Sequence, residues 1–367
     1  TLTLDVTDFA GNVKTGAASR TILVDNSAPT TSFNSFVEVS GNNYIYAPAA
    51  GSTMYYNPIG TGSFKVLINA SDLGAGVNRV DFPAPGANWT PTVTSSDTTA
   101  PSPYEYTYTF TTPSGASPGL LNTTAYDNAG KSANASFTLT KDNTAPAGGS
   151  ISYADGVRNT TAVTITLDPG SDAQAGLNTQ TLERAVATYA NGACGAYGAF
   201  GTLATSPGTS YNDSTLASGS CYMYRFTVTD NVDNSVTYTS ASVVKVDTAL
   251  PTGTISATPV GPIGGVLNNI SGTASDTGSG VKRVDVTYAN GATTGNICLD
   301  APTPTTWNCG WNTATLPNGI YTITLVVTDN AGLTNTSSIT RTIGIDNIAP
   351  TVSVSGFTPT SGAAYLY

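Results

Sequence analysis

Aspartate residues recur in this sequence at three places within a pattern that repeats along the chain. One kind lies in an acidic turn such as "VTDNAGL", a second in a tail such as "VDNSAP", and a third in a turn such as "ASDTGSGV". The turn set is Asp8, Asp127, Asp230 and Asp329, the tail set is Asp25, Asp142, Asp247 and Asp346, and the third set is Asp72, Asp172 and Asp276, with Asp168 close to Asp172. Carboxylates can coordinate a hard cation, but Asp in such turns also bonds its own backbone.

The spacing of these aspartates defines a tandem repeat. Turn and tail lie 15 to 17 residues apart, and successive tails lie 117, 105 and 99 residues apart. Residues 1–46 also align without a gap on residues 322–367, with 16 identities in the first 29 positions. Repeats of this length predict domains of about 100 residues each. We therefore interpret the chain as one A-B-C cycle of a longer array.

The pattern within each repeat is all-β. Segments such as "GSFKVLINAS", "YRFTVTD" and "YTITLVVTD" alternate or run apolar for short stretches. Gly, Pro, Asn and Asp separate these segments, and no helical period of ten residues stands out. About seven short strands per repeat predict a β-sandwich with Greek-key connections.

These signatures carry a resemblance to a known family. The turn "VTDNAG", the tail "VDNSAP" and the loop "ASDTGSGV" resemble those of bacterial immunoglobulin-like (Big-type) repeats of large surface proteins and adhesin stalks. The resemblance covers essentially the whole chain and implies tandem immunoglobulin-like sandwiches in a rod-like array. It also implies a role in a stalk, adhesin or filament on the bacterial cell surface, with calcium at the domain junctions.

The predicted boundaries follow the Ala-Pro steps of the tails. Residues 1–28 are predicted as the C-terminal hairpin of a preceding domain, and residues 350–367 as the first strand of a following A-type domain. Between them lie domain A at 29–145, with an aromatic-rich insertion, domain B at 146–250 and domain C at 251–349.

The three kinds of aspartate are expected to converge at the junctions. In an immunoglobulin-like sandwich, the loop between strands B and C and the turn between strands F and G lie at one end. That end also receives the linker from the preceding domain. The predicted groups are Asp25, Asp72 and Asp127; Asp142, Asp172 and Asp230, joined by Asp233; and Asp247, Asp276 and Asp329, while Asp346 would serve a junction with a further domain. Calcium suits such oxygen-only groups, and the alternative is that each Asp only stabilises its own turn.

Four cysteines are predicted to form two disulfides. Cys194 and Cys221 lie in domain B, and Cys298 and Cys309 lie in domain C. The chain has no histidine and no Cys-x-x-Cys motif, which disfavours a zinc–thiolate site and a catalytic cysteine. Disulfides indicate an oxidising, extracellular compartment.

The insertion in domain A, Val37–Ser63, supplies the alternative function. Its residues Tyr44, Tyr46, Tyr55 and Tyr56, together with Trp89, could bind a glycan or a protein if exposed. Otherwise, the rings pack over the sandwich edge or on a neighbouring domain.

Composition narrows the function classes further. A net charge of −10 and a pI near 4.2 disfavour nucleic acid as a partner. No apolar stretch is long enough to enter a membrane as a helix. No nucleophile elbow or phosphate loop is present, and the acidic groups recur at every junction, unlike a single catalytic site. The sequence predicts a structural protein whose partners are neighbouring domains of the same chain, with surface glycans or proteins as further candidates.

Overall fold

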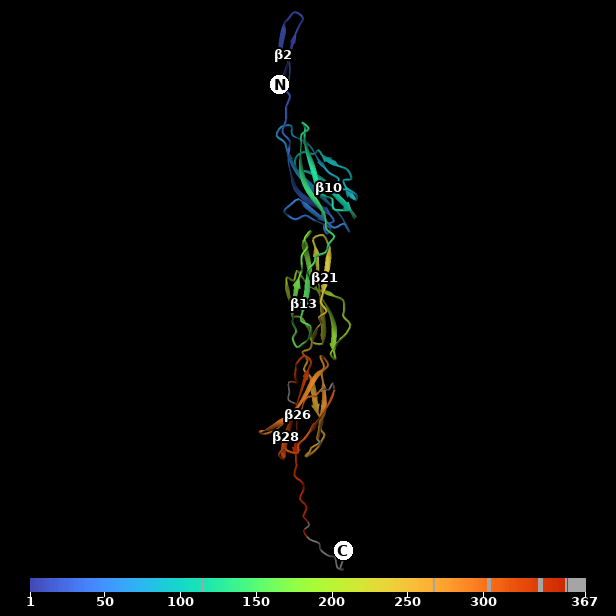
Figure 1. Ribbon diagram of the computed structural model, residues 1–367, viewed down its shortest axis with the longest axis vertical. Helices are drawn as coiled ribbons and strands as arrows, with labels where there is room; N and C mark the ends of the chain where they lie inside the picture. Colours follow the sequence, from blue (N-terminus) through green and yellow to red (C-terminus); the bar gives the residue numbers. More distant parts are fainter. Residues whose placement is uncertain (114, 267, 302–304, 336–338, 354, 356–367) are drawn as a thin grey trace, which may run out of the picture.

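The computed structural model describes residues 1–113, 115–266, 268–301, 305–335, 339–353 and 355. Every regular element among these residues is a β-strand. Three sandwiches, A, B and C, lie end to end along the long axis, and a two-stranded hairpin precedes the first (Figure 1). The predicted all-β, rod-like array is thus confirmed. In the described part of the chain, no helix is long and apolar enough to cross a membrane.

Sandwich A consists of a four-stranded and a six-stranded sheet. The first sheet has the order β3-β6-β10-β8, and the second has the order β4-β5-β12-β11-β7-β9. The strands are β3 (Thr30–Ser40), β4 (Ile45–Tyr46), β5 (Thr53–Tyr56), β6 (Thr61–Ser71), β7 (Val77–Phe82), β8 (Trp89–Thr90), β9 (Ser95–Asp97), β10 (Tyr104–Thr111), β11 (Gly119–Asp127) and β12 (Ser132–Lys141). Successive side chains of β6 point alternately into and away from the core, so Phe64, Val66 and Ile68 are fully buried between more exposed neighbours.

Sandwich B has a three-stranded sheet, β13-β15-β19, and a larger sheet built around β14-β22-β20-β16-β17. In the larger sheet, β18 also pairs with β16, and β21 with β20. The strands are β13 (Ser150–Tyr153), β14 (Gly156–Arg158), β15 (Val163–Asp168), β16 (Leu177–Ala190), β17 (Ala193–Cys194), β18 (Gly201–Thr205), β19 (Ser210–Asp213), β20 (Ser220–Asp230), β21 (Ser235–Thr239) and β22 (Val244–Val246).

Sandwich C packs the sheet β23-β24-β27 against the sheet β26-β25-β28-β29. Its strands are β23 (Thr252–Ile255), β24 (Asn268–Ser275), β25 (Val281–Asn290), β26 (Thr293–Ala301), β27 (Thr306–Trp311), β28 (Gly319–Asp329) and β29 (Ile339–Ile345). Each sandwich encloses a hydrophobic core of its own.

One parallel pairing recurs beside the last strand of each sandwich. The pairs are β5 with β12 in A, β14 with β22 in B, and an isolated bridge between Ile263 and Ile345 in C. In A, this pairing incorporates the predicted insertion into the second sheet, because β4 and β5 form a hairpin along β12. The insertion is therefore part of the sandwich wall.

The N-terminal hairpin pairs β1 (Leu2–Thr7) with β2 (Val13–Arg20). It aligns with the β28–β29 region of sandwich C, yet its apolar side chains are exposed: Leu4 is 58% exposed, whereas the aligned Leu325 is 0% exposed. Its assignment to a preceding sandwich stays a prediction. The predicted strand in 350–367 lies almost wholly outside the described residues.

Candidate metal centres at the domain joints

Three groups of three carboxylates lie at the ends of the sandwiches. The first joint, between the hairpin and sandwich A, has Asp25, Asp72 and Asp127. The middle joint, between A and B, has Asp142, Asp172 and Asp230, and the third joint, between B and C, has Asp247, Asp276 and Asp329. Within each group, one carboxylate oxygen from each residue lies within 4.8 Å of the others. The structure thus brings together the three kinds of aspartate that the sequence singles out.

The linker aspartate reaches the next sandwich through one hydrogen bond that is the same at every joint. Its Oδ2 accepts the backbone N–H of Ala75, at 2.7 Å from Asp25; of Ala175, at 3.0 Å from Asp142; or of Ser279, at 2.6 Å from Asp247. These three acceptors follow the last strand of the preceding unit. Their partners lie in the loop after the second long strand of the next sandwich, which we call the B–C loop after the immunoglobulin strands that it joins, not after sandwiches B and C. The bond therefore anchors each linker to the sandwich that it enters.

The B–C loop aspartate closes its own loop. Asp72 Oδ1 accepts the backbone N–H groups of Gly74 and Gly76 at 3.0 and 2.8 Å, and Asp172 Oδ1 accepts those of Gln174 and Gly176 at 2.9 and 2.8 Å. Gly76 has a φ of +75°, a conformation that glycine adopts readily. This bonding is the turn-stabilising role that the sequence leaves open, and it occupies only Oδ1.

The third carboxylate comes from the turn between the last two long strands, the F–G turn. Asp127 Oδ1 accepts the N–H of Lys131, and Asp329 Oδ1 accepts that of Leu333, both at 2.8 Å. The other oxygen, Oδ2, of both Asp127 and Asp329 is buried without a hydrogen-bond donor. A buried, unpartnered carboxylate oxygen is costly, and a bound cation would satisfy it.

The electrostatics of the groups also favour a cation. Burial raises the pKa of Asp329, and the nearby Asp247 and Asp276 raise it further. Burial likewise raises the pKa of Asp230, with a contribution from Asp142. At the first joint, by contrast, hydrogen bonds from the backbone N–H groups of Ser27 and Ala75 lower the pKa of Asp25. Residues that supply only oxygen fit the ligand preference of calcium, which accepts oxygen ligands in flexible geometry.

Two predicted metal ligands lie elsewhere. Asp233 is exposed and is not part of the middle group. It has a φ of +70° and occupies the turn position that Gly130 and Gly332 hold in the other sandwiches. Its predicted membership of the group is therefore corrected. Asp346 is exposed and accepts a hydrogen bond from Asn318 Nδ2 at 2.7 Å, and no described carboxylate joins it in a group.

Both predicted disulfides are present. Cys194–Cys221 joins β17 to β20 within one sheet of sandwich B, and Cys298–Cys309 joins β26 to β27 between the two sheets of sandwich C. Sandwich A has no cysteine.

The aromatic side chains of the insertion do not form an exposed platform. Tyr56 is 0% exposed and Trp89 is 3% exposed, with their rings 4.9 Å apart in an edge-to-face arrangement. The prediction that these two residues bind a ligand is corrected, because β5 and β8 turn them into the core. Tyr44, Tyr46 and Tyr55 are half-buried.

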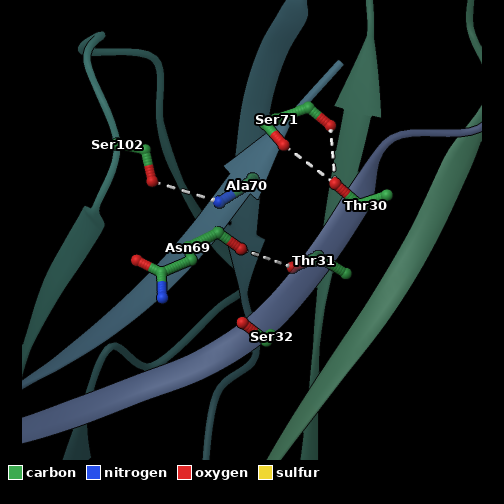
Figure 2. Close-up of a pocket in the computed structure, with 7 residues that line it drawn as sticks. All are labelled: Thr30, Thr31, Ser32, Asn69, Ala70, Ser71 and Ser102. Atoms are coloured by element: carbon green, nitrogen blue, oxygen red, sulfur yellow. Dashed lines mark hydrogen bonds between the residues drawn. The ribbon is translucent and has the colours of Figure 1, made fainter. Parts of the chain in front are cut away.

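A surface hollow on sandwich A is lined by uncharged residues. Figure 2 shows Thr30 bonded to Ser71, Thr31 bonded to the carbonyl of Asn69, and Ser102 bonded to the N–H of Ala70. Ser32 completes the lining. The lining offers Ser and Thr hydroxyls, but none of the residues that line it carries a carboxylate, amine or thiol that could act as a general base for them.

Sequence reasoning missed several polar residues at the joints. Asn57, Gln174 and Asn234 make side-chain contacts at the middle joint. The signal in the sequence was that Gln174 and Asn234 differ from the repeat pattern. Sandwich A has Gly74 and Lys131 at these positions, and sandwich C has Gly278 and Leu333.

Comparisons with known proteins agree with this architecture. Residues 263–325 match the family described as a bacterial Ig domain, and residues 305–367 match the group 3 bacterial Ig-like domain. No curated protein matches the sequence.

Similar solved structures include repeat regions of large adhesins. One is a tetra-tandem repeat in the extending region of a large adhesion protein, with 16% identity, coverage of 94% of this chain and 80% of that chain, and a TM-score of 0.36. Another is a Ca2+-stabilized adhesin that helps an Antarctic bacterium bind ice, with 18% identity, 93% and 80% coverage, and a TM-score of 0.40. A 1.5-MDa bacterial ice-binding adhesin has 17% identity, 89% and 99% coverage, and a TM-score of 0.39.

The turn, tail and loop signatures of the two matched regions recur in all three sandwiches. Residues 263–367 thus match bacterial immunoglobulin-like domain families, and sandwiches A and B repeat the same signatures in tandem with the matched region.

Proposed function

We propose that this chain is a structural repeat segment of an extracellular stalk, adhesin or filament on a bacterial surface, with calcium bridging the joints. The observation that carries the proposal is the recurrence of the same three-carboxylate group at three successive joints. A group needed for catalysis would be expected once, whereas a group that couples neighbouring domains is needed at every joint.

The carboxylates come from elements that move relative to one another when a joint bends. Asp247 directly follows β22 of sandwich B, while Asp276 directly follows β24 and Asp329 ends β28 of sandwich C. Calcium bound by these three residues would supply the positive charge that offsets their mutual repulsion. The last strand of one sandwich would then be fixed to two loops of the next, which limits bending.

The proposed domains are 29–145, 146–250 and 251–349, each folding around its own core. The disulfides of B and C support an oxidising, extracellular location. Neighbouring domains of a longer chain are the proposed partners.

The full chain tests the calcium proposal directly. We expect calcium, compared with chelator, to raise the melting temperature and to increase the maximum dimension in small-angle X-ray scattering. Affinities should be about 10⁻⁴–10⁻³ M, as in other extracellular calcium modules. The proposal fails if chelation changes neither quantity.

A triple variant localises the effect. Asp247→Asn, Asp276→Asn and Asp329→Asn together should remove one bound calcium per chain in a calorimetric titration, while circular dichroism stays that of folded sandwiches. Asp168→Asn is the matched control, because Asp168 also closes a turn, accepting the N–H of Gly170 at 2.9 Å, but lies outside the groups. Unchanged calcium stoichiometry in the triple variant would contradict the assignment.

A further inference from the structure

The end of sandwich B that faces sandwich A departs from the repeat at four positions. Gln174 replaces the glycine of the B–C loop, and Val232, Asp233 and Asn234 replace the Ala-Gly-Lys or Ala-Gly-Leu of the F–G turn. The other two sandwiches share Ala and Gly at the corresponding places. All four positions lie in loops at the middle joint.

Asn57 of sandwich A binds the F–G turn of sandwich B. Its Nδ2 donates to the carbonyl of Val232 and to Asn234 Oδ1, both at 2.8 Å, and its Oδ1 accepts the N–H of Ile59 at 3.1 Å. Asn57 is 0% exposed. Both amide hydrogens and the carbonyl oxygen thus have partners, which is the condition for burying an asparagine without penalty.

The other departures add to the same contact. Gln174 Nε2 donates to the carbonyl of Lys141 at 3.0 Å, and Thr144 Oγ1 donates to Gln174 Oε1 at 2.9 Å, so the linker is held on both sides of Asp142. Val232 is 0% exposed although it lies at the end of a turn, where the equivalent Ala129 is exposed.

Asn234 connects this contact to the carboxylate group. Its Nδ2 donates to Asp230 Oδ2 at 2.8 Å and to the carbonyl of Asp142 at 3.4 Å. At the other two joints, the equivalent Oδ2 atoms of Asp127 and Asp329 are buried without a donor. The middle joint therefore has an internal hydrogen-bond donor where the other joints leave an oxygen for a cation.

The third joint is closed in a different way. The β16–β17 turn of sandwich B donates two backbone bonds to the B–C loop of C, from Asn191 N to Thr277 O and from Gly192 N to Gly278 O, both at 3.0 Å. These bonds leave the Asp329 carboxylate oxygen without a donor.

We propose that Val232, Asn234 and Gln174 form a latch that recognises the Asn57 end of sandwich A and holds the middle joint without a cation. Of the two joints between sandwiches, the third is then the more flexible when calcium is absent. The contrast in calcium response rests on the proposed function, whereas the latch does not.

Distance measurements on the full chain test the latch. Spectroscopic labels at Leu120, Val186 and Ile320 place one probe on each sandwich, at exposed positions. They should be attached through non-natural amino acids, because the cysteines are in disulfides. In chelator, we expect the Leu120–Val186 distance distribution of the unaltered protein to stay narrow and the Val186–Ile320 distribution to broaden.

Asn57→Ala should open the middle joint alone. Loss of its two hydrogen bonds to sandwich B should raise the fraction of molecules with an open middle joint in chelator by about 30-fold. The Val186–Ile320 distance distribution should stay unchanged. Asn57→Asp keeps the acceptor for Ile59 and removes the donors, so it should act in the same way even if the alanine variant disturbs sandwich A. Asn178→Ala, an exposed asparagine of sandwich B, is the control.

A reciprocal exchange separates the latch from the calcium proposal. Asn234→Leu gives the middle joint the residue of sandwich C and should make the width of the Leu120–Val186 distance distribution calcium-dependent. Leu333→Asn should reduce the calcium dependence of the Val186–Ile320 distribution, which reports on the third joint. The latch is refuted if neither Asn57 variant broadens the middle distribution, or if both joints of the unaltered protein open equally in chelator. If the Asn57 variants open the middle joint but no joint responds to calcium, the latch stands and the calcium proposal falls.

Discussion

Sandwiches A and B differ in how their interiors are held together. The core of A is aromatic: Tyr56, Phe64, Trp89, Tyr108 and Phe110 are buried, and A has no cysteine. Sandwich B instead combines a mainly aliphatic and tyrosine core with a disulfide and an ion pair between the half-buried Arg184 and the buried Asp213.

The difference shows which features the repeat shares. The interiors of A and B use different chemistry, yet both sandwiches present an aspartate in the B–C loop and one in the F–G turn. Any well-packed core can support such loops, but coupling to a neighbour requires the same groups at the same end. The comparison also implies that A and B should respond differently to core substitution, reduction and acid.

The largest effect is expected from removing the central ring of sandwich A. Trp89→Ala should lower the free energy of unfolding of A by about 3–5 kcal/mol, because Trp89 contacts the rings of Tyr56, Phe64 and Phe110. Hydrogen exchange followed by mass spectrometry should show faster exchange in A alone. Tyr55→Ala, in the same wall but half-buried, is the control and should cost much less. Equal loss of protection in B would contradict separate cores.

Reduction should produce the opposite pattern. The cysteines of the Cys194–Cys221 disulfide are separated by 27 positions in the sequence, and those of the Cys298–Cys309 disulfide by 11. Their reduction should destabilise B by about 3.5 kcal/mol and C by about 3 kcal/mol through loop entropy. Sandwich A serves as the internal control, and its melting transition should not move when reductant is added.

The smallest effect is expected at Asp213 in sandwich B. This buried carboxylate accepts hydrogen bonds from Arg184 Nη1 at 2.7 Å, Tyr224 OH at 2.8 Å and Thr215 Oγ1 at 2.7 Å. Burial alone would raise the pKa of Asp213, but the donors of Thr215, Arg184 and Tyr224 outweigh burial and lower it. Asp213→Asn should therefore destabilise B at neutral pH by about 2–3 kcal/mol.

The acid dependence follows from the same lowered pKa. In the unfolded chain, an aspartate titrates at about pH 3.9. The stabilisation from ionised Asp213 is therefore complete well above that pH and is lost as the pH falls through the lower folded pKa. Chemical denaturation across this acid range should show a smaller loss of stability for B in the Asp213→Asn variant. An identical slope in both proteins would show that Asp213 does not contribute.

Much of this architecture could be predicted from sequence because it depends on local patterns that recur. Alternating apolar residues indicate strands, Asp-Asn-Ala-Gly indicates the F–G turn, and the cysteines fall in pairs within single repeats. The grouping of Asp247, Asp276 and Asp329 follows once the sandwich topology is assumed, because that topology places both loops and the linker at one end. An isolated Asp of this kind can be explained by its own turn, whereas its recurrence in every repeat pointed to a shared carboxylate group.

The tertiary structure alone decided the contacts that do not recur. Tyr56 and Trp89 could have been exposed or buried until the pairing of β5 with β12 directed Tyr56 into the core. Asn57 and Asn234 lie 177 residues apart and meet only because two sandwiches are stacked end to end. The sequence determined the strands, the turns and the positions of the carboxylates, since these depend on neighbouring residues. The Asn234 donor to Asp230 is also local, because the two residues share one turn, but whether Asn57 of one sandwich meets Asn234 of the next depends on the packing of two separate cores, which no local pattern encodes.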